Sequence, residues 1–153
     1  RAYIQNGDVG KLHILVQTGD LHLFSNGRHN TSYIASGGDL NFNVQRGDLY
    51  VISQGNSYVF AEGEGEIYTG SNIHVYDNAI KTKGNLHVQA GQSIYLGQNG
   101  SIENSGKDLL ILAGKDLNMA ATSHIDNIGG QNLTIAVDHD VSRPKECGMG
   151  RLI

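Results

Sequence analysis

Proline, cysteine and long apolar runs are nearly missing from this chain of 153 residues. With Pro144 as the single proline, chain reversals must be made by Gly and Asn instead. The single cysteine, Cys147, cannot form an intrachain disulfide, so an oxidising compartment is allowed but not demanded. No apolar segment approaches the roughly 20 residues needed to cross a bilayer, and we therefore expect no membrane span.

Positive charge is also scarce. The chain has 11 Lys and Arg against 15 Asp and Glu, a net charge of −4, and its basic residues form no run. Because a nucleic-acid surface needs clustered positive charge, we expect no nucleic-acid partner. The chain begins at Arg1 with neither Met nor a signal peptide, which indicates a processed product or an excised fragment.

Glycine is abundant, at 21 residues, near twice its usual share of about 7%. It punctuates a repeat over residues 84–137 that reads GNLHVQA, GQSIYLGQ, NGSIENS, GKDLLILA, GKDLNMAA, TSHIDNIG and GQNLTIAV. In most units two core-type residues flank one variable residue, and this period of two is typical of a β-strand. Units this short have no room for a helix between strands. The repeat therefore predicts a β-solenoid in which each unit stacks on others like it.

Looser units of the same kind precede the repeat and raise the number of candidate strands to sixteen. Their first core positions are residues 12, 21, 33, 40, 49, 58, 67, 73, 80, 86, 94, 102, 109, 117, 125 and 133. A polar loop at residues 26–32 stretches the spacing. With three strands and roughly 24 residues per coil, the chain forms an all-β parallel β-helix of about five coils. Residues 1–137 would be the repeat domain and residues 138–153 a C-terminal cap or tail.

Two alternatives stay open at this point. Two strands per coil would give a thin sandwich, and residues 109–121 are rich in good helix formers. The interior of the three-strand arrangement is consistent, because none of its paired core positions carries a charge. Its polar exceptions, Asn104 and Asn127, lie one coil apart. We expect them to point inward and to hydrogen-bond to each other as an amide ladder.

The segments GNLHVQAGQSIYLG and GKDLLILAGKDLNMAA resemble the haemagglutinin-type repeats of filamentous haemagglutinin-like exoproteins, which bacteria export by two-partner secretion. The resemblance covers residues 7–137 approximately. It implies a right-handed parallel β-helix that serves as the structural shaft of a secreted or cell-surface adhesin or contact-dependent toxin-delivery protein. Such a shaft needs no catalysis and no cofactor. Two features depart from the family: its Asn-Pro-Asn secretion motifs are missing, and no toxin-like C-terminal domain follows.

Partners follow from the same resemblance and from the solenoid itself. The resemblance implies a surface protein or a glycan on a host or neighbouring cell. A solenoid also has two open ends with unpaired backbone groups, so we expect end-to-end self-association as a further mode.

The outward middle positions form columns when every third strand is taken together. One column contains His22, Tyr50, His74, Tyr95 and Asn118. Rings stacked one coil apart would make a flat aromatic strip with polar edges, suited to binding sugar rings or a partner protein. The plainer interpretation is that Tyr and His suit exposed strand positions and pack on one another across coils.

A second column contains Ile34, Val59, Lys81, Glu103 and Asp126. It would place the two carboxylates about 5 Å apart, a separation at which paired carboxylates can cleave glycosidic bonds. This supports an alternative function, a carbohydrate-binding or carbohydrate-cleaving β-helix protein acting along one face. In the plainer interpretation Lys81 offsets Glu103 in a solvated ladder. We therefore expect no catalytic residues and no enzyme.

Acidic and histidine side chains are also spread along the chain without a metal-binding motif. The side chains weighed as ligands are Glu62, Glu64, Glu66, Asp138, His139, Asp140, His13, His22, His74 and His87. The nonapeptide GGxGxDxUx of calcium-binding solenoids is missing, and no His-x-His pair occurs among the strand histidines. We expect no metal site.

Overall fold

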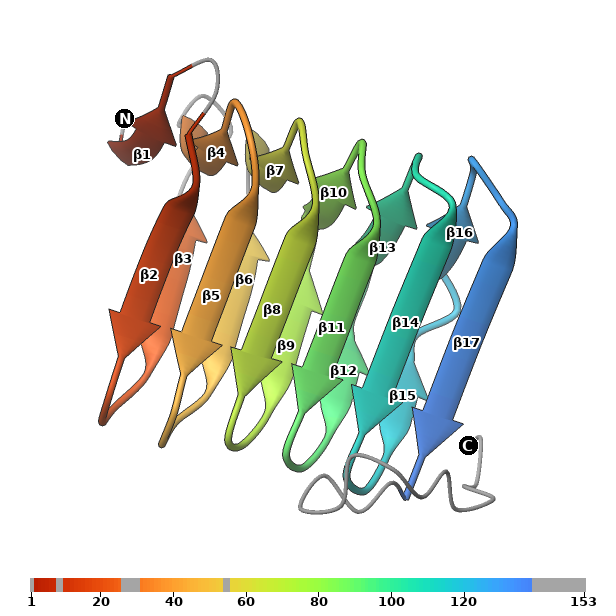
Figure 1. Cartoon of the computed structure of the whole chain (residues 1–153). Helices are drawn as coiled ribbons and strands as arrows, with labels where there is room; N and C mark the ends of the chain where they lie inside the picture. The colour runs from red at the N-terminus through yellow and green to blue at the C-terminus, as the bar shows by residue number, and fades with distance from the viewer. Residues whose placement is uncertain (1, 8–9, 26–30, 54–55, 139–153) are drawn as a thin grey trace.

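The chain winds into a parallel β-solenoid with three strands in each coil (Figure 1). The structure, a computed structural model, describes residues 2–7, 10–25, 31–53 and 56–138, and these residues form strands and turns without any helix. The strands build three sheets, named A, B and C here. Each sheet grows by one strand per coil, because the chain returns to it after passing through the other two.

Sheets A and B have six strands each and sheet C has five, within the described residues. Sheet A contains β1 (Ala2–Asn6), β4 (Thr31–Ser36), β7 (Asn56–Ala61), β10 (Ala79–Thr82), β13 (Ser101–Asn104) and β16 (His124–Asn127). Sheet B contains β2 (Leu12–Val16), β5 (Leu40–Val44), β8 (Gly65–Thr69), β11 (Leu86–Ala90), β14 (Asp108–Ala113) and β17 (Asn132–Val137). Sheet C contains β3 (Leu21–Ser25), β6 (Leu49–Ser53), β9 (Ile73–Tyr76), β12 (Ile94–Leu96) and β15 (Leu117–Met119).

This topology confirms the predicted all-β solenoid of about five coils and excludes the two-strand alternative. The helical alternative is wrong, because residues 109–121 are divided between β14 and β15. Coils shorten toward the middle of the chain. Residues bonded across neighbouring coils are 28 positions apart at Asp20 and Asp48, but only 21 apart at Asn72 and Ser93.

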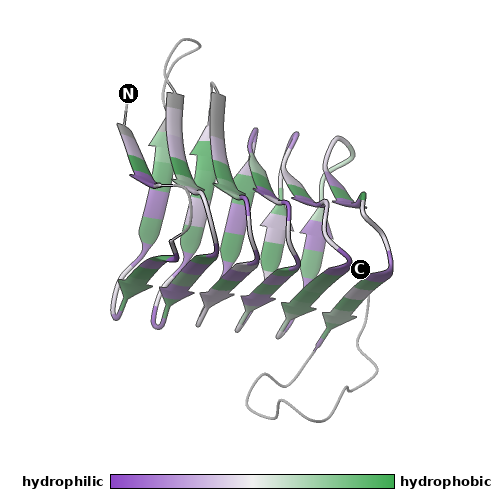
Figure 2. Cartoon of the chain, turned by 45° about the horizontal axis from the view of Figure 1, so that its top comes forward, coloured by the Kyte–Doolittle hydropathy of each residue, from purple (hydrophilic) through white to green (hydrophobic). Residues whose placement is uncertain are grey.

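Apolar side chains fill the interior because alternate residues of every strand point inward, and the hydropathy colours alternate along the strands accordingly (Figure 2). Burying one such side chain contributes about 1.5–3 kcal/mol relative to leaving it exposed. The largest fully buried side chains are Phe42, Leu40, Leu49, Ile67, Ile73, Ile80, Leu86, Ile94, Leu96, Ile102, Leu109 and Ile111. The core is therefore continuous along the coils rather than concentrated in one place.

Glycine is required where corners of successive coils touch. Gly70, Gly91 and Gly114 each follow a strand of sheet B and lie one above the next. A Cβ on Gly91 would lie 2.3 Å from the carbonyl oxygen of Gly70, and one on Gly114 would lie 2.1 Å from that of Gly91. The neighbouring backbone cannot move far enough to relieve contacts this short. The regularly spaced glycines of the sequence are therefore required by the close approach of the corners.

Asn104 points inward as predicted and is fully buried, and its register partner in the next coil is Asn127. The predicted amide ladder between them is wrong. The Asn104 amide donates to the carbonyl oxygens of Gly84 at 3.2 Å and Asp108 at 2.8 Å. The Asn127 amide donates to backbone carbonyls in the same way, the closest contact being 2.8 Å to Asn132. These side chains hold the corner backbone instead of each other.

The predicted register is wrong by one residue in two early strands. Ile34 and Val59 point inward and are 3% and 0% exposed, whereas the sequence analysis placed them outward. Their neighbours Tyr33 and Tyr58, taken there as core positions, lie on the outside of sheet A. The pattern misleads because β4 places small Ser side chains inward, at Ser32 and Ser36, while its aromatic residue is solvent-facing.

The ends of the chain differ in part from the predicted boundaries. A strand that the sixteen candidates omit, β1, pairs with β4 on sheet A. Residues 31 and 32, assigned to the polar loop, belong to β4. The last strand, β17, ends at Val137. The proposed cap falls on residues 138–153, of which residues 139–153 lie outside the described residues.

Candidate functional site

Five outward side chains lie in one line along sheet C and form the sheet C ladder: His22, Tyr50, His74, Tyr95 and Asn118. Neighbouring rings stack with centroids 4.6, 4.5 and 4.9 Å apart and with interplanar angles of 5°, 5° and 7°. The predicted adjacency of these residues is confirmed. Their role in binding stays a prediction.

The stack follows directly from in-register parallel pairing. Neighbouring strands lie about 4.7–4.9 Å apart, so planar rings at one register position in successive coils meet at stacking distance. Their faces cover one another, and their edges carry the polar atoms. The His22 side chain is 59% exposed at the start of the ladder, whereas that of His74 is 18% exposed in its middle.

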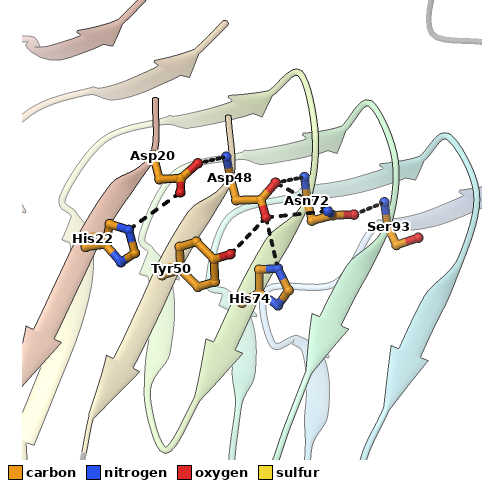
Figure 3. A network of polar contacts seen from close by, with 7 residues as sticks. All are labelled: Asp20, His22, Asp48, Tyr50, Asn72, His74 and Ser93. Atoms are coloured by element: carbon orange, nitrogen blue, oxygen red, sulfur yellow. Dashed lines mark hydrogen bonds and ion pairs between the residues drawn. The ribbon is translucent and has the colours of Figure 1, made fainter. Parts of the chain in front are cut away.

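A second ladder of polar side chains fixes the corner that precedes sheet C (Figure 3). The Asp20 carboxylate accepts the backbone N–H of Asp48 at 2.8 Å, and the Asp48 carboxylate accepts that of Asn72 at 2.9 Å. The Asn72 side-chain oxygen then accepts the N–H of Ser93 at 3.0 Å. Each side chain thus binds the backbone of the next coil. The sequence analysis missed this ladder, although the repeated Gly-Asp pairs were its signal.

Asp48 joins the polar ladder to the aromatic one (Figure 3). Its carboxylate accepts the Tyr50 hydroxyl at 3.0 Å and lies 3.5 Å from Nε2 of His74. The His74 contact is within ion-pair range, but its geometry is not that of a hydrogen bond. Asp48 and His74 therefore attract each other as charges only when the imidazole is protonated.

The hydrogen bonds at this junction change the acidity of its members. Partial burial alone would raise the pKa of Asp48, but hydrogen bonds from the Asn72 backbone, Tyr50 and the Asn72 side chain lower it overall. The bond to Asp48 raises the pKa of Tyr50, since it favours the protonated phenol. Asp48 thus stays ionised and holds the Tyr50 ring from its polar edge.

The aromatic part of the sheet C ladder ends beside a recess. This recess has a volume of about 400 Å³ and opens where Asn118 replaces the next ring after Tyr95. Tyr76 and Met119 also line it, and Met119 is 44% exposed. Tyr76 lies against Gly97, where a Cβ would come within 1.9 Å of the ring. The ladder therefore combines a strip of polar ring edges with one hollow at its end.

The predicted charge column is correct for three of its members. Lys81, Glu103 and Asp126 are register neighbours on sheet A, and Nζ of Lys81 lies 2.9 Å from the Glu103 carboxylate. His124 adds contacts of 3.4 Å to Glu103 and 3.7 Å to Asp126. Burial would raise the pKa of Glu103, but Lys81 and Ser101 lower it overall. A carboxyl group with a lowered pKa is poorly suited to the general-acid role that glycoside cleavage requires.

Sheet A carries a ring stack that the sequence analysis missed, the sheet A ladder of Tyr3, Tyr33 and Tyr58. Its centroids are 5.3 and 5.1 Å apart, with interplanar angles of 9° and 3°. The next register position is Ala79, which ends the stack. Shifting the predicted register of β4 and β7 by one residue would have found it, since Tyr33 and Tyr58 align with Ala79, two residues before Lys81.

The remaining candidate ligands are dispersed. Glu62 follows β7 and lies 2.6 Å from Nζ of Lys83, whereas Glu66 on β8 accepts the Asn41 amide at 2.8 Å. Residues 139 and 140 lie outside the described residues. Within the described ranges, no group of three or more His, Cys, Asp or Glu side chains is close enough to hold a metal ion.

Comparisons of this chain with protein-family models, with curated proteins and with solved structures give no match. The resemblance to haemagglutinin-type repeats therefore rests on the repeat pattern alone. Among residues 2–7, 10–25, 31–53 and 56–138, no helix is long and apolar enough to cross a membrane.

Proposed function

We propose that this chain is a structural and adhesive shaft segment of a large bacterial exoprotein of the filamentous haemagglutinin-like type, secreted or displayed at the cell surface by two-partner secretion. The sheet C ladder is its contact surface. The observation that carries the proposal is the continuous, parallel stacking of His22, Tyr50, His74 and Tyr95 on one face.

The shaft role is supported by how the coils are joined. In a solenoid each coil contacts only its neighbours, so coils can be added without changing the existing ones. Here successive coils are linked by in-register strand pairing and also by side chains that bind the next backbone, as at Asp48 and Asn72. A segment built this way transmits load along its axis through many parallel hydrogen bonds.

The adhesive role is supported by the rigidity and chemistry of the ladder. Stacked rings lose little conformational entropy on binding, and Tyr is enriched at protein interfaces. Because ring faces are covered by their neighbours, a partner must bind the polar edges. Phenol hydroxyls and imidazole nitrogens suit both polar protein side chains and glycan hydroxyls. The partner is a surface protein or glycan of a host or neighbouring cell.

The test separates the contribution of the polar ring edges to binding from that of the stacked rings. Tyr50→Phe combined with Tyr95→Phe keeps the rings but removes both hydroxyls. The matched control is Tyr33→Phe combined with Tyr58→Phe on the sheet A ladder. Binding of the fluorescent chain is measured on glycan arrays and on bacterial and epithelial cell surfaces, after circular dichroism has confirmed equal folding.

We expect the sheet C variant to bind at least about tenfold more weakly than the intact chain, equivalent to about 1.4 kcal/mol. The control should bind as the intact chain does. Equal binding by all three chains, or no binding by the intact chain to any of these surfaces, would overturn the adhesive role.

A further inference from the structure

Sheet B carries a polar recess on the face formed by β5, β8 and β11, away from the sheet C ladder. Its volume is about 280 Å³, near the lower limit of roughly 300 Å³ that is usual for small-ligand pockets. Six outward side chains line it in two columns of three: Asn41, Glu66 and His87, and Asn43, Tyr68 and Gln89.

Two polar atoms of the residues that line this recess are buried and have no hydrogen-bond partner within the described part of the chain: Oδ1 of Asn43 and Nε2 of His87. Leaving a buried polar group unpaired costs free energy, and most such groups in folded proteins are paired. Their neighbour Glu66 is already held by the Asn41 amide at 2.8 Å. The recess thus combines one fixed carboxylate with two unpaired polar atoms that have almost no accessible surface, so a ligand reaches them only when the Asn43 or His87 side chain rotates.

His87 contributes a neutral ring to the recess. Burial lowers the pKa of His87, although the nearby Glu66 carboxylate raises it in part. A neutral imidazole offers one N–H donor and one acceptor nitrogen. Nε2 of His87 is therefore either a hydrogen-bond donor or an acceptor. A ligand hydroxyl group fits both cases because it can both donate and accept a hydrogen bond.

The lining also decides between classes of ligand. Among the described residues, no Lys or Arg lines the recess, and Glu66 repels anions. A divalent cation would need several oxygen ligands around one point, whereas this site offers a single carboxylate. Neutral amides, a phenol and an imidazole instead favour a neutral ligand that carries several hydroxyl groups.

Spacing matches one sugar ring. Neighbouring coils are about 4.8 Å apart and alternate residues of a strand are about 6.8 Å apart, so the six side chains form a grid of the size of a hexopyranose. An adjoining recess of about 150 Å³ shares Glu66 and His87 and adds Asn85 and Asp108. A second sugar unit would occupy it.

We propose that this recess binds a hexopyranose unit of a neutral glycan, with hydroxyl groups hydrogen-bonded to Asn43 and His87 and oriented by Glu66. This site lies on another sheet from the ladder, so it holds whether or not the ladder is adhesive.

The test uses the whole chain and NMR titration with methyl glycosides of glucose, galactose, mannose and N-acetylglucosamine. Sialic acid and Ca²⁺ alone serve as the anionic and cationic probes. The readout is the imidazole resonances of His87, compared with those of His13, which lies on the same sheet three coils earlier. Asn43→Leu removes one unpaired atom and should fold at least as stably, because no hydrogen bond is lost.

We expect at least one neutral glycoside to shift the His87 resonances saturably while those of His13 stay unchanged. Asn43→Leu should weaken that binding at least about tenfold, while His13→Gln should leave it intact. No His87 shift with any neutral glycoside, a stronger response to sialic acid or Ca²⁺, or unchanged binding by Asn43→Leu would each overturn the proposal.

Discussion

The two ring stacks of this solenoid are built by the same pairing geometry but held differently. Rings of the sheet C ladder lie 4.5–4.9 Å apart, and the Asp48 carboxylate holds Tyr50 at its polar edge. Rings of the sheet A ladder lie 5.1 and 5.3 Å apart. In this ladder the Tyr33 hydroxyl donates a hydrogen bond of 3.3 Å to Oε1 of Gln5, in an exposed place.

This difference distinguishes two contributions to ring stacking: the strand register, and the hydrogen bonds of neighbouring side chains. Register alone brings tyrosines of successive coils to stacking distance, as on sheet A. On sheet C a polar group also holds the rings in place. The Asp48 carboxylate does so because it accepts both the Tyr50 hydroxyl and the backbone N–H of Asn72. A defined contact surface is therefore expected on sheet C, and a looser exposed stack on sheet A.

The largest effect is expected from removing the carboxylate that distinguishes the two ladders. Asp48→Ala leaves the Asn72 N–H and the Tyr50 hydroxyl without their acceptor. It should lower the free energy of unfolding by about 2–3 kcal/mol, as losing hydrogen bonds to a charged group does. Gln5→Ala, the matched change beside the sheet A ladder, should stay within about 0.5 kcal/mol. Urea denaturation measures both, and equal losses would remove the distinction between the ladders.

A smaller difference is expected between rings inside and at the end of a stack. Tyr50→Leu removes two ring contacts and one hydrogen bond, whereas Tyr58→Leu removes a single ring contact, to Tyr33. Since an aromatic pair contributes about 0.5–1.5 kcal/mol, Tyr50→Leu should cost about 1 kcal/mol more in unfolding free energy. If Tyr58→Leu were the more destabilising change, ring stacking on sheet C would contribute little to stability.

The smallest effect is expected in the response to acid. The pKa of Asp48 is lowered by folding, so its contribution to stability is complete above the unfolded value, near 3.8. That contribution is lost as the pH falls through the lower pKa of the folded chain. Denaturation curves at a series of pH values should therefore show that Asp48→Asn loses less stability on acidification than the intact chain. Tyr58→Leu, on sheet A, should follow the intact chain. An Asp48→Asn chain as acid-sensitive as the original would show that Asp48 is not held ionised.

Much of the fold could be predicted because residues 84–137 repeat at nearly constant spacing. A constant period fixes which residue of each unit points inward, and Asn104 was placed correctly for that reason. The sheet C ladder could be predicted as well, since β3, β6, β9 and β12 each have a single ring between two aliphatic residues.

The early coils are harder because inward positions there are not always apolar. Ser32 and Ser36 are buried, and the Ser36 hydroxyl donates to the carbonyl of Asp39 at 2.7 Å at the corner. A prediction based on hydrophobicity alone therefore shifts the register of β4 by one residue, and the sheet A ladder is then not recognised. The recess on sheet B was also not predictable, since it depends on which neighbouring polar side chains leave atoms unpaired.

Every contact in both ladders depends on the pairing register of the coils, and nitroxide labels measure that register directly. Lys81→Cys, Glu103→Cys and Asp126→Cys are introduced singly and together in a Cys147→Ser background, because these three positions are register neighbours on sheet A. With coils about 4.8 Å apart, the triple-labelled chain should show strong spin exchange and dipolar broadening in its electron paramagnetic resonance spectrum. A triple-label spectrum equal to the sum of the three single-label spectra would contradict the stacking of every third strand.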